Sequence, residues 1–264
     1  MTTSSARDTD QEPDSVLTWL LEPSEPSVRY VALTGLMGKP ADDPEVRSAR
    51  AAIMREGLVP DLLSLQNEDG SWDDPERFYT AKYKGTVWTL LLLAELCADP
   101  AHPQVRHAGQ FILKHSQHPE SGGFSYTTSA KTGTGLASGV IPCLTGNMVY
   151  SLIRLGFLDD ARVQQGIDWI VRLQRADDGD DQPPKDPAYA RYEMCWGRHS
   201  CHMGVAKALK ALTSIPPDRR STAVTAKIDQ LTEYFLVHHL YKKSHNLAEV
   251  AKPGWLKPGF PLMY

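Results

Sequence analysis

Three cysteines and one histidine are the side chains of this sequence whose types suit a metal ion. Cys195 and Cys201 are six residues apart, His202 follows directly, and Cys143 lies 52 residues before Cys195. Thiolates and imidazoles are common ligands of Zn²⁺, which binds four such groups at the corners of a tetrahedron. The sequence therefore predicts a zinc site at these four residues, if the fold brings the two segments together.

A second interpretation of the same residues needs no metal. The spacing is not that of a standard zinc finger. Neighbouring residues of a helix also point about 100° apart, so Cys201 and His202 would face different directions. Buried thiols are common, and Ser200 is of a type that often caps helices. The alternative is thus three buried cysteines and a histidine in the first turn of a helix.

Two kinds of helical segment alternate along the chain and must position these residues. The first kind is an apolar block followed by a loop rich in glycine or aspartate, and the second kind ends in the pattern Leu-x-x-Leu. Apolar residues recur at intervals of three and four, which predicts helices with buried faces. Each pair is a hairpin of about fifty to sixty residues, so the chain is predicted to be an all-α repeat protein. The apolar blocks begin at Asp61, Phe111, Trp169 and Tyr234, and the Leu-x-x-Leu ends lie at 93–96, 152–155 and 209–212.

The connections between these segments are of two lengths. Proline, glycine and aspartate at 99–103, 156–160 and 215–217 stop one helix and start the next within a few residues. The other connections are long, of about twenty residues or more, and loops of this length are usually functional or mobile. These long loops span 66–85, 116–142 and 174–200.

Alignment of the Leu-x-x-Leu ends relates the predicted site to the repeat. It places His202 opposite Thr145 and Thr86, and Cys201 opposite Leu144. Cys143 and Cys201 are therefore predicted at the starts of consecutive helices of the second kind. Helix N-termini favour thiolates, which are the forms that bind metal.

The start of the chain and its composition limit the domain organisation and the classes of partner that can be expected. Residues 1–13 are polar and acidic and are predicted to form a disordered leader without a secretion signal. Residues 14–264 are predicted to form one domain, opening with a helix pair at 14–36 that resembles a HEAT repeat and caps the array. The net charge of −4 and the pI of about 6.1 exclude a strongly basic nucleic-acid binder. No apolar run is long enough for a transmembrane segment, so a cytoplasmic protein is expected.

One loop carries a family resemblance. The sequence Leu65-Gln-Asn-Glu-Asp-Gly-Ser-Trp72 is similar to the QW-type repeat of squalene–hopene cyclases, and weaker copies lie at 121–124 and 173–179. From about residue 59 onwards the chain resembles the bacterial squalene cyclase-like, or prenyltransferase-repeat, proteins of the terpenoid cyclase and protein prenyltransferase superfamily. The matching elements are 84–90, 141–147, 195–202 and 255–261.

The resemblance implies an α/α toroid, in which parallel inner helices are surrounded by outer ones. The N-termini of the inner helices and the long loops would then share one mouth, where the three cysteines and His202 would meet. Protein prenyltransferases hold zinc at a similar mouth, so the resemblance implies the place but not the ligands. In such relatives a further helix follows the Gly-Phe-Pro element at 259–261, so an incomplete or open toroid is expected.

The resemblance also suggests catalytic residues. Asp178, Asp180 and Asp181 have the Asp-x-Asp-Asp form of the acid that starts carbocation cyclisation in class II terpenoid cyclases. Such chemistry needs an aromatic wall to stabilise cations. The candidates for that wall are Tyr79, Tyr83, Trp88, Tyr150 and Trp196. The alternative is a solvated acidic loop, because Asp178 and Gly179 align with the repeat's own turn at Asp69 and Gly70.

Two functions follow as hypotheses. The first is binding of a hydrophobic small molecule of the isoprenoid class in a central cavity, with terpenoid cyclisation or prenyl transfer as the reaction. The second is a non-catalytic scaffold whose concave surface binds a peptide or protein partner and whose cysteines and histidine hold a structural zinc ion. An aromatic-lined cavity favours the first, and a filled core favours the second.

Overall fold

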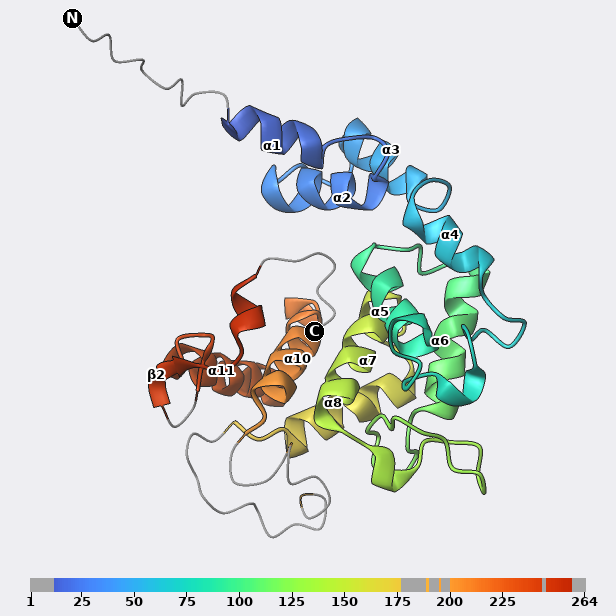
Figure 1. Cartoon of the computed structure of the whole chain (residues 1–264), viewed down its shortest axis with the longest axis vertical. Helices are drawn as coiled ribbons and strands as arrows, with labels where there is room; N and C mark the ends of the chain where they lie inside the picture. Colours follow the sequence, from blue (N-terminus) through green and yellow to red (C-terminus); the bar gives the residue numbers. More distant parts are fainter. Residues whose placement is uncertain (1–11, 177–188, 190–194, 196–199, 244–245, 258–264) are drawn as a thin grey trace, which may run out of the picture. The chain divides into compact units, whose positions relative to one another are not determined.

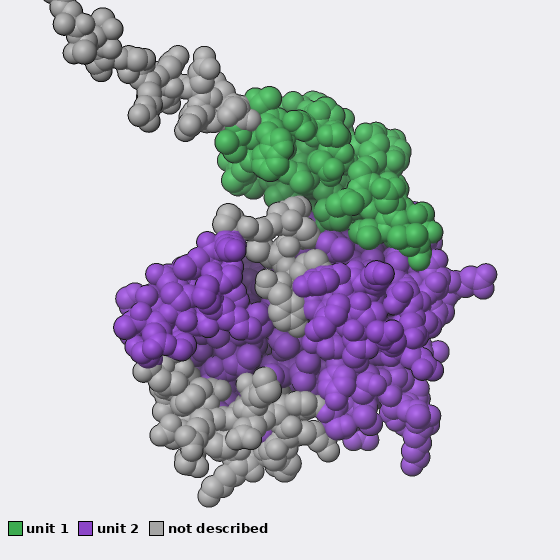
Figure 2. All heavy atoms as spheres, in the orientation of Figure 1, with its two compact units in different colours: residues 1–65, 96–99 green, residues 66–95, 100–264 purple. Residues whose placement is uncertain are grey.

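The computed structural model describes residues 12–176, 189, 195, 200–243 and 246–257, and this part of the chain is mostly helical, as predicted (Figure 1). Most of the predicted leader, residues 1–11, lies outside the described residues, and the first helix begins at Glu12. The chain divides into two compact units, residues 1–65 with 96–99 and residues 66–95 with 100–264 (Figure 2). Within the described residues, every helix is too short or too polar to cross a bilayer.

The first unit contains the helix pair predicted near the start of the chain. Its helices are α1 (Glu12–Leu20), α2 (Pro26–Val31), the π-helical η1 (Ala32–Leu36), α3 (Pro44–Ala52) and α4 (Leu58–Ser64). Helices α2 and α3 pack together, and Leu33, Val46 and Ala49 form their buried core. The Asp43 carboxylate caps α3 by accepting a hydrogen bond of 2.8 Å from the Glu45 backbone N–H.

The second unit is built from helices in two layers. In the first layer α5 (Thr86–Glu95) packs on α7 (Pro142–Arg154), and α7 packs on α10 (His202–Thr213) (Figure 1). In the second layer α6 (Pro103–His115), α8 (Ala161–Leu173) and α11 (Thr222–Val237) cover α5, α7 and α10 respectively. Short helical turns lie at η2 (Pro75–Arg77), η3 (Lys82–Lys84), η4 (Ala137–Gly139), η5 (Pro217–Arg219) and η6 (Pro253–Leu256).

The burial pattern explains these layers. Nearly every residue of α5 and α7 is buried, whereas α6 and α8 bury one face and expose the other. Long loops precede α5 and α7, and short connections follow α5, α7 and α10, in the predicted order; most of the predicted loop 174–200 lies outside the described residues.

Glycines let α7 and α10 approach each other closely. A Cβ atom added at Gly204, near the start of α10, would lie 3.2 Å from the Pro142 side chain at the start of α7. One turn further on, a Cβ at Gly146 would lie 2.6 Å from the backbone carbonyl carbon of Lys207. The contacts advance in the same direction along both helices, so α7 and α10 run parallel.

Replacing Gly146 by alanine is expected to lower the free energy of unfolding by about 1–3 kcal/mol, because α10 must move away from α7 to admit the methyl group. Chemical denaturation would measure the change. Gly35→Ala is the matched control, since a Cβ at Gly35 would meet nothing within 4 Å. Equal stability of the two variants would contradict the close packing.

Two sets of side-chain hydrogen bonds recur at equivalent positions of successive hairpins. The Gln66 side-chain amide donates to the carbonyl oxygens of Gly70 (3.1 Å) and Gln104 (2.9 Å). The Gln117 amide likewise donates to the carbonyl oxygens of Gly122 (2.9 Å) and Arg162 (2.6 Å). Each glutamine therefore joins its own loop to the first turn of the next helix in the second layer.

The threonines at the starts of α5 and α7 form the second set of hydrogen bonds. The Thr86 hydroxyl accepts a hydrogen bond of 3.0 Å from the Trp72 backbone N–H. The Thr145 hydroxyl accepts one of 2.9 Å from the Phe124 backbone N–H. These equivalent bonds support the alignment of the Leu-x-x-Leu ends.

The β-structure is small. Isolated bridges Gln117–Phe124, Ser125–Val140 and Thr128–Gly135 lie in and beside the long loop before α7. An antiparallel pair, β1 (Lys242–Lys243) and β2 (Asn246–Val250), follows α11 and was not predicted. Its residues are mostly exposed and lack the alternation of apolar and polar side chains that marks a half-buried strand.

Candidate functional site: a thiol cluster and a lysine-lined cavity

Two of the predicted cysteines, Cys195 and Cys201, interact with each other near the start of α10. Cys143 lies in the first turn of α7, and Cys201 is the N-cap of α10, where its Sγ accepts a hydrogen bond of 3.4 Å from the Gly204 N–H. The thiols of Cys195 and Cys201 are hydrogen-bonded to each other, and Cys143 interacts electrostatically with Cys195. All four cysteines of the chain lie among the described residues, and none of them forms a disulfide.

The hydrogen bonds decide which thiol of the pair ionises. The Cys195 thiol and the backbone N–H groups of Gly204 and Met203 stabilise a negative charge on Cys201, so the pKa of Cys201 lies below its ordinary value. The pKa of Cys195 is raised, because its hydrogen bond to Cys201 and its burial both favour the protonated form. Cys201 is therefore the nucleophilic member of the pair.

Alkylation with iodoacetamide at increasing pH is expected to label Cys201 before Cys195. The thiolate is the reactive form, so the rate at Cys201 should rise through a pH below the ordinary thiol range and then level off. Peptide mass spectrometry of chelator-treated protein would follow each site. In a Cys201→Ser variant, Cys195 loses its partner and should become reactive at lower pH than in the original chain. Faster labelling of Cys195 in the original chain would contradict this assignment.

His202 does not face the thiols. Its Nε2 donates to the carbonyl oxygen of Leu240 (3.0 Å), and its Nδ1 is hydrogen-bonded to the hydroxyl of Tyr234 (3.0 Å). The ring stacks on Trp255, with centroids 5.1 Å apart. Burial, with a smaller effect of His238, lowers the pKa of His202 and favours the neutral ring.

This arrangement does not fit the predicted set of four zinc ligands, because both ring nitrogens of His202 are already hydrogen-bonded. Among the described residues, no group of three or more histidine, cysteine or acidic side chains is arranged to hold a metal ion. Zinc at the cysteines stays a prediction from the sequence. Metal analysis of protein purified without an affinity-metal step, beside a Cys201→Ser variant, would test it.

The other predicted site residues fall into three groups. Asp178, Asp180, Asp181 and Trp196 lie outside the described residues. The rings of Tyr79 and Tyr83 lie 5.9 and 5.5 Å from that of Trp88, so these three form one aromatic cluster at the start of α5. Tyr150 lies instead in α7, with the Lys210 ammonium 4.2 Å from its ring centroid.

A cavity of about 310 Å³, here called the α10 cavity, lies beside His202. It is formed by α10, α11 and the segment around η6. Its wall combines apolar and aromatic side chains with three lysines. The lining residues are His202, Met203, Ala206, Lys207, Lys210, Phe235, Leu240, Gly254, Trp255 and Lys257.

Two of the lysines lie one helical turn apart on α10 and differ in environment. Lys210 forms an ion pair with Glu95 of α5. Lys207 is only 7% exposed, and burial, followed by the nearby charge of Lys210, lowers its pKa to about 8. Sequence reasoning missed both residues, although two lysines in the otherwise apolar segment 203–212 were a signal that could have identified them.

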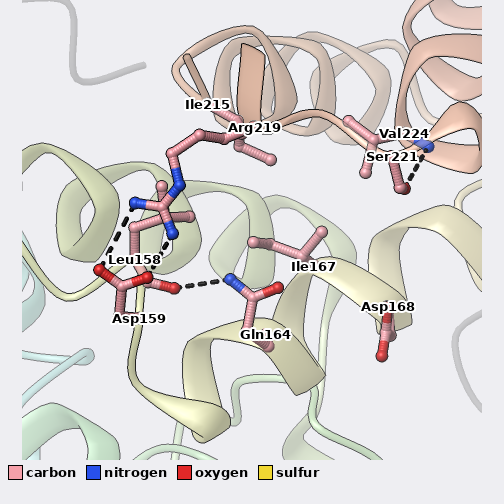
Figure 3. A pocket seen from close by; sticks show the side chains of 9 residues that line it. All are labelled: Leu158, Asp159, Gln164, Ile167, Asp168, Ile215, Arg219, Ser221 and Val224. Carbon is pink, nitrogen blue, oxygen red and sulfur yellow. Dashed lines mark hydrogen bonds and ion pairs between the residues drawn. The ribbon is translucent and has the colours of Figure 1, made fainter. Parts of the chain in front are cut away.

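A second cavity of about 310 Å³ lies between α8 and the segment 215–224 (Figure 3). Arg219 forms an ion pair there with Asp159 and lowers the pKa of that carboxyl group. The Gln164 amide donates to the Leu158 carbonyl oxygen (2.6 Å). Because Asp159, Asp168 and Arg219 line this cavity and it has no aromatic side chain in its wall, it suits an apolar ligand less well than the α10 cavity does.

The chain matches no protein-family model and no curated protein. Its function must therefore be argued from the geometry of the candidate site.

Proposed function

We propose that this chain binds an apolar small molecule of the isoprenoid class in the α10 cavity. The observation that carries the proposal is the side-chain composition of the wall, where Met203, Phe235 and Trp255 surround a volume of about 310 Å³. Small-molecule sites are typically concave, mostly apolar and about 300–1,000 Å³ in volume. The cavity lies at the lower end of that range, so a short isoprenoid is expected rather than a triterpenoid.

The lysines orient the ligand. Lys257 places positive charge at the cavity, whereas the charge of Lys210 is paired with Glu95. The charge of Lys257 favours a polar or anionic head group next to an apolar body. The same charge opposes a carbocation. The proposal is therefore binding of a preformed isoprenoid, with prenyl transfer better supported than cyclisation.

Calorimetric titration with geraniol and geranyl phosphate would test the proposal. Phe235→Ala is expected to weaken binding of both at least tenfold, since loss of one aromatic contact costs about 1.4 kcal/mol or more. The matched control is Tyr83→Ala, which removes an exposed aromatic residue of the Trp88 cluster. Loss of binding in Tyr83→Ala alone would move the site to that cluster. No binding by the original chain would reject the proposal and favour the scaffold hypothesis.

We also propose that the two helix layers belong to an open α/α toroid. The parallel course of α7 and α10 and the long loops before α5 and α7 support this arrangement. An experimental structure in which the helices of the first layer do not surround a common axis would reject it. The cytoplasmic location stays a prediction from the sequence.

A further inference from the structure

Lys207 places a buried primary amine in the wall of the α10 cavity. The residue is 7% exposed, and its side chain lines the cavity together with Met203 and Ala206 of the same helix. Its backbone is fixed against α7, because Gly146 has no Cβ and α10 fills that space. The amine is therefore held on a rigid element at the edge of an apolar volume.

The charged groups around Lys207 come from three helices. Lys210 follows one turn later on α10 and lowers the pKa of Lys207, whereas Glu95 of α5 and Cys143 of α7 raise it. Burial has the largest effect, and the pKa falls to about 8. His202 and Lys257 line the same cavity. At pH 7.5 roughly a quarter of such an amine is neutral, against about one part in a thousand for an ordinary lysine.

A neutral buried amine is a nucleophile that suits carbonyl compounds. Catalytic lysines that form Schiff bases are activated in this way, by desolvation in an apolar pocket or by a second cation nearby. Lys207 has both features. The cavity also accepts an apolar body next to the amine, so a ligand with a terminal carbonyl would place its carbon near Nζ.

We propose that Lys207 forms an imine with the aldehyde group of an apolar ligand in the α10 cavity. The Nζ lone pair forms the C–N bond to the carbonyl carbon and gives a carbinolamine. The carbonyl oxygen then leaves as water and takes both amine protons, so neither an oxidant nor a reductant is consumed. This inference rests on the proposed function, and it narrows the ligand class from isoprenoids in general to isoprenoid aldehydes.

Reductive trapping tests the inference on the full chain. Citral, an isoprenoid aldehyde, is added with sodium cyanoborohydride, which converts an imine into a stable secondary amine. Intact mass and peptide mapping are expected to show one adduct, on Lys207, formed at least tenfold faster than any adduct on exposed Lys114 of α6. Lys207→Met should abolish this adduct, and Lys114→Met should retain it.

The pH dependence of trapping gives a second readout. The rate at Lys207 should rise with pH and level off above about 8, where the amine is neutral, whereas an ordinary lysine continues to gain reactivity to above pH 10. Adducts spread over exposed lysines, or an unchanged adduct in Lys207→Met, would overturn the inference. Peptide mapping of the original chain decides the site even if that variant does not fold.

Geraniol separates failure of the inference from failure of the proposed function, because it has a similar carbon skeleton to citral but no carbonyl group. Binding of geraniol without trapping of citral on Lys207 would reject the imine and leave the proposed function standing. Absence of geraniol binding together with absence of citral trapping would reject the imine and the proposed function.

Discussion

Replacing Trp169 by alanine is expected to lower the free energy of unfolding by about 3–5 kcal/mol, the range seen for large aromatic residues removed from a core. Trp169 lies on α8 and is 1% exposed. Its indole packs directly under the backbone of the long loop before α7, since a Cβ added at Gly123 would lie 2.7 Å from the indole nitrogen. The truncated side chain would leave a void between α8 and that loop.

Urea denaturation followed by circular dichroism would measure this loss. The control is Leu236→Ala on α11, where the side chain is 61% exposed and little apolar area is lost. That variant is expected to stay within about 0.5 kcal/mol of the original chain. If Trp169→Ala destabilised no more than the control, the indole would not be part of the core.

Replacing Gln117 by leucine should have the second largest effect on stability and lower the free energy of unfolding by about 2–3 kcal/mol. The two side chains are similar in size, but leucine cannot donate to the carbonyl oxygens of Gly122 and Arg162. Gln117 is 2% exposed, so water cannot easily replace the missing donor, and a buried acceptor without a partner costs about 1–3 kcal/mol.

The equivalent change in the preceding repeat is the internal comparison for Gln117→Leu. Gln66 makes the same pair of bonds, to Gly70 and Gln104, but it is only partly buried. Gln66→Leu should therefore destabilise the protein by roughly 1 kcal/mol, because water can reach the carbonyl groups. Thermal unfolding of both variants would rank them. A larger effect at Gln66 would show that burial does not control how much these hydrogen bonds contribute to stability.

The helical hairpins were predictable because their signals are local. The apolar spacing, the prolines and the Leu-x-x-Leu ends each act within a few residues of the helix that they specify. The alignment of those ends also placed Thr86 and Thr145 in equivalent positions, and both accept a backbone N–H from the preceding loop. Thus the repeat register could be read without tertiary information.

The candidate site was predicted only in part. Cys143 and Cys201 lie at the starts of α7 and α10, where the alignment of the repeats placed them. The direction of the His202 ring was not predictable, because Tyr234, Leu240 and Trp255 contact it from segments more than thirty residues further along the chain. The burial of Lys207 depends on the close approach of α7 at Gly146, which the spacing of apolar residues does not report.

The ion pair between Glu95 and Lys210 connects the two ends of the α5, α7 and α10 layer across 115 residues of sequence. In a linear repeat array each repeat contacts its neighbours, so the terminal repeats can fray independently. Lys210 contacts both α5, through Glu95, and α7, through the Tyr150 ring. A contact between residues so far apart in the sequence forms late in folding, because the intervening chain must first be ordered. Unfolding of α10 should therefore disturb all three helices at once, and the second unit is expected to unfold in a single cooperative transition.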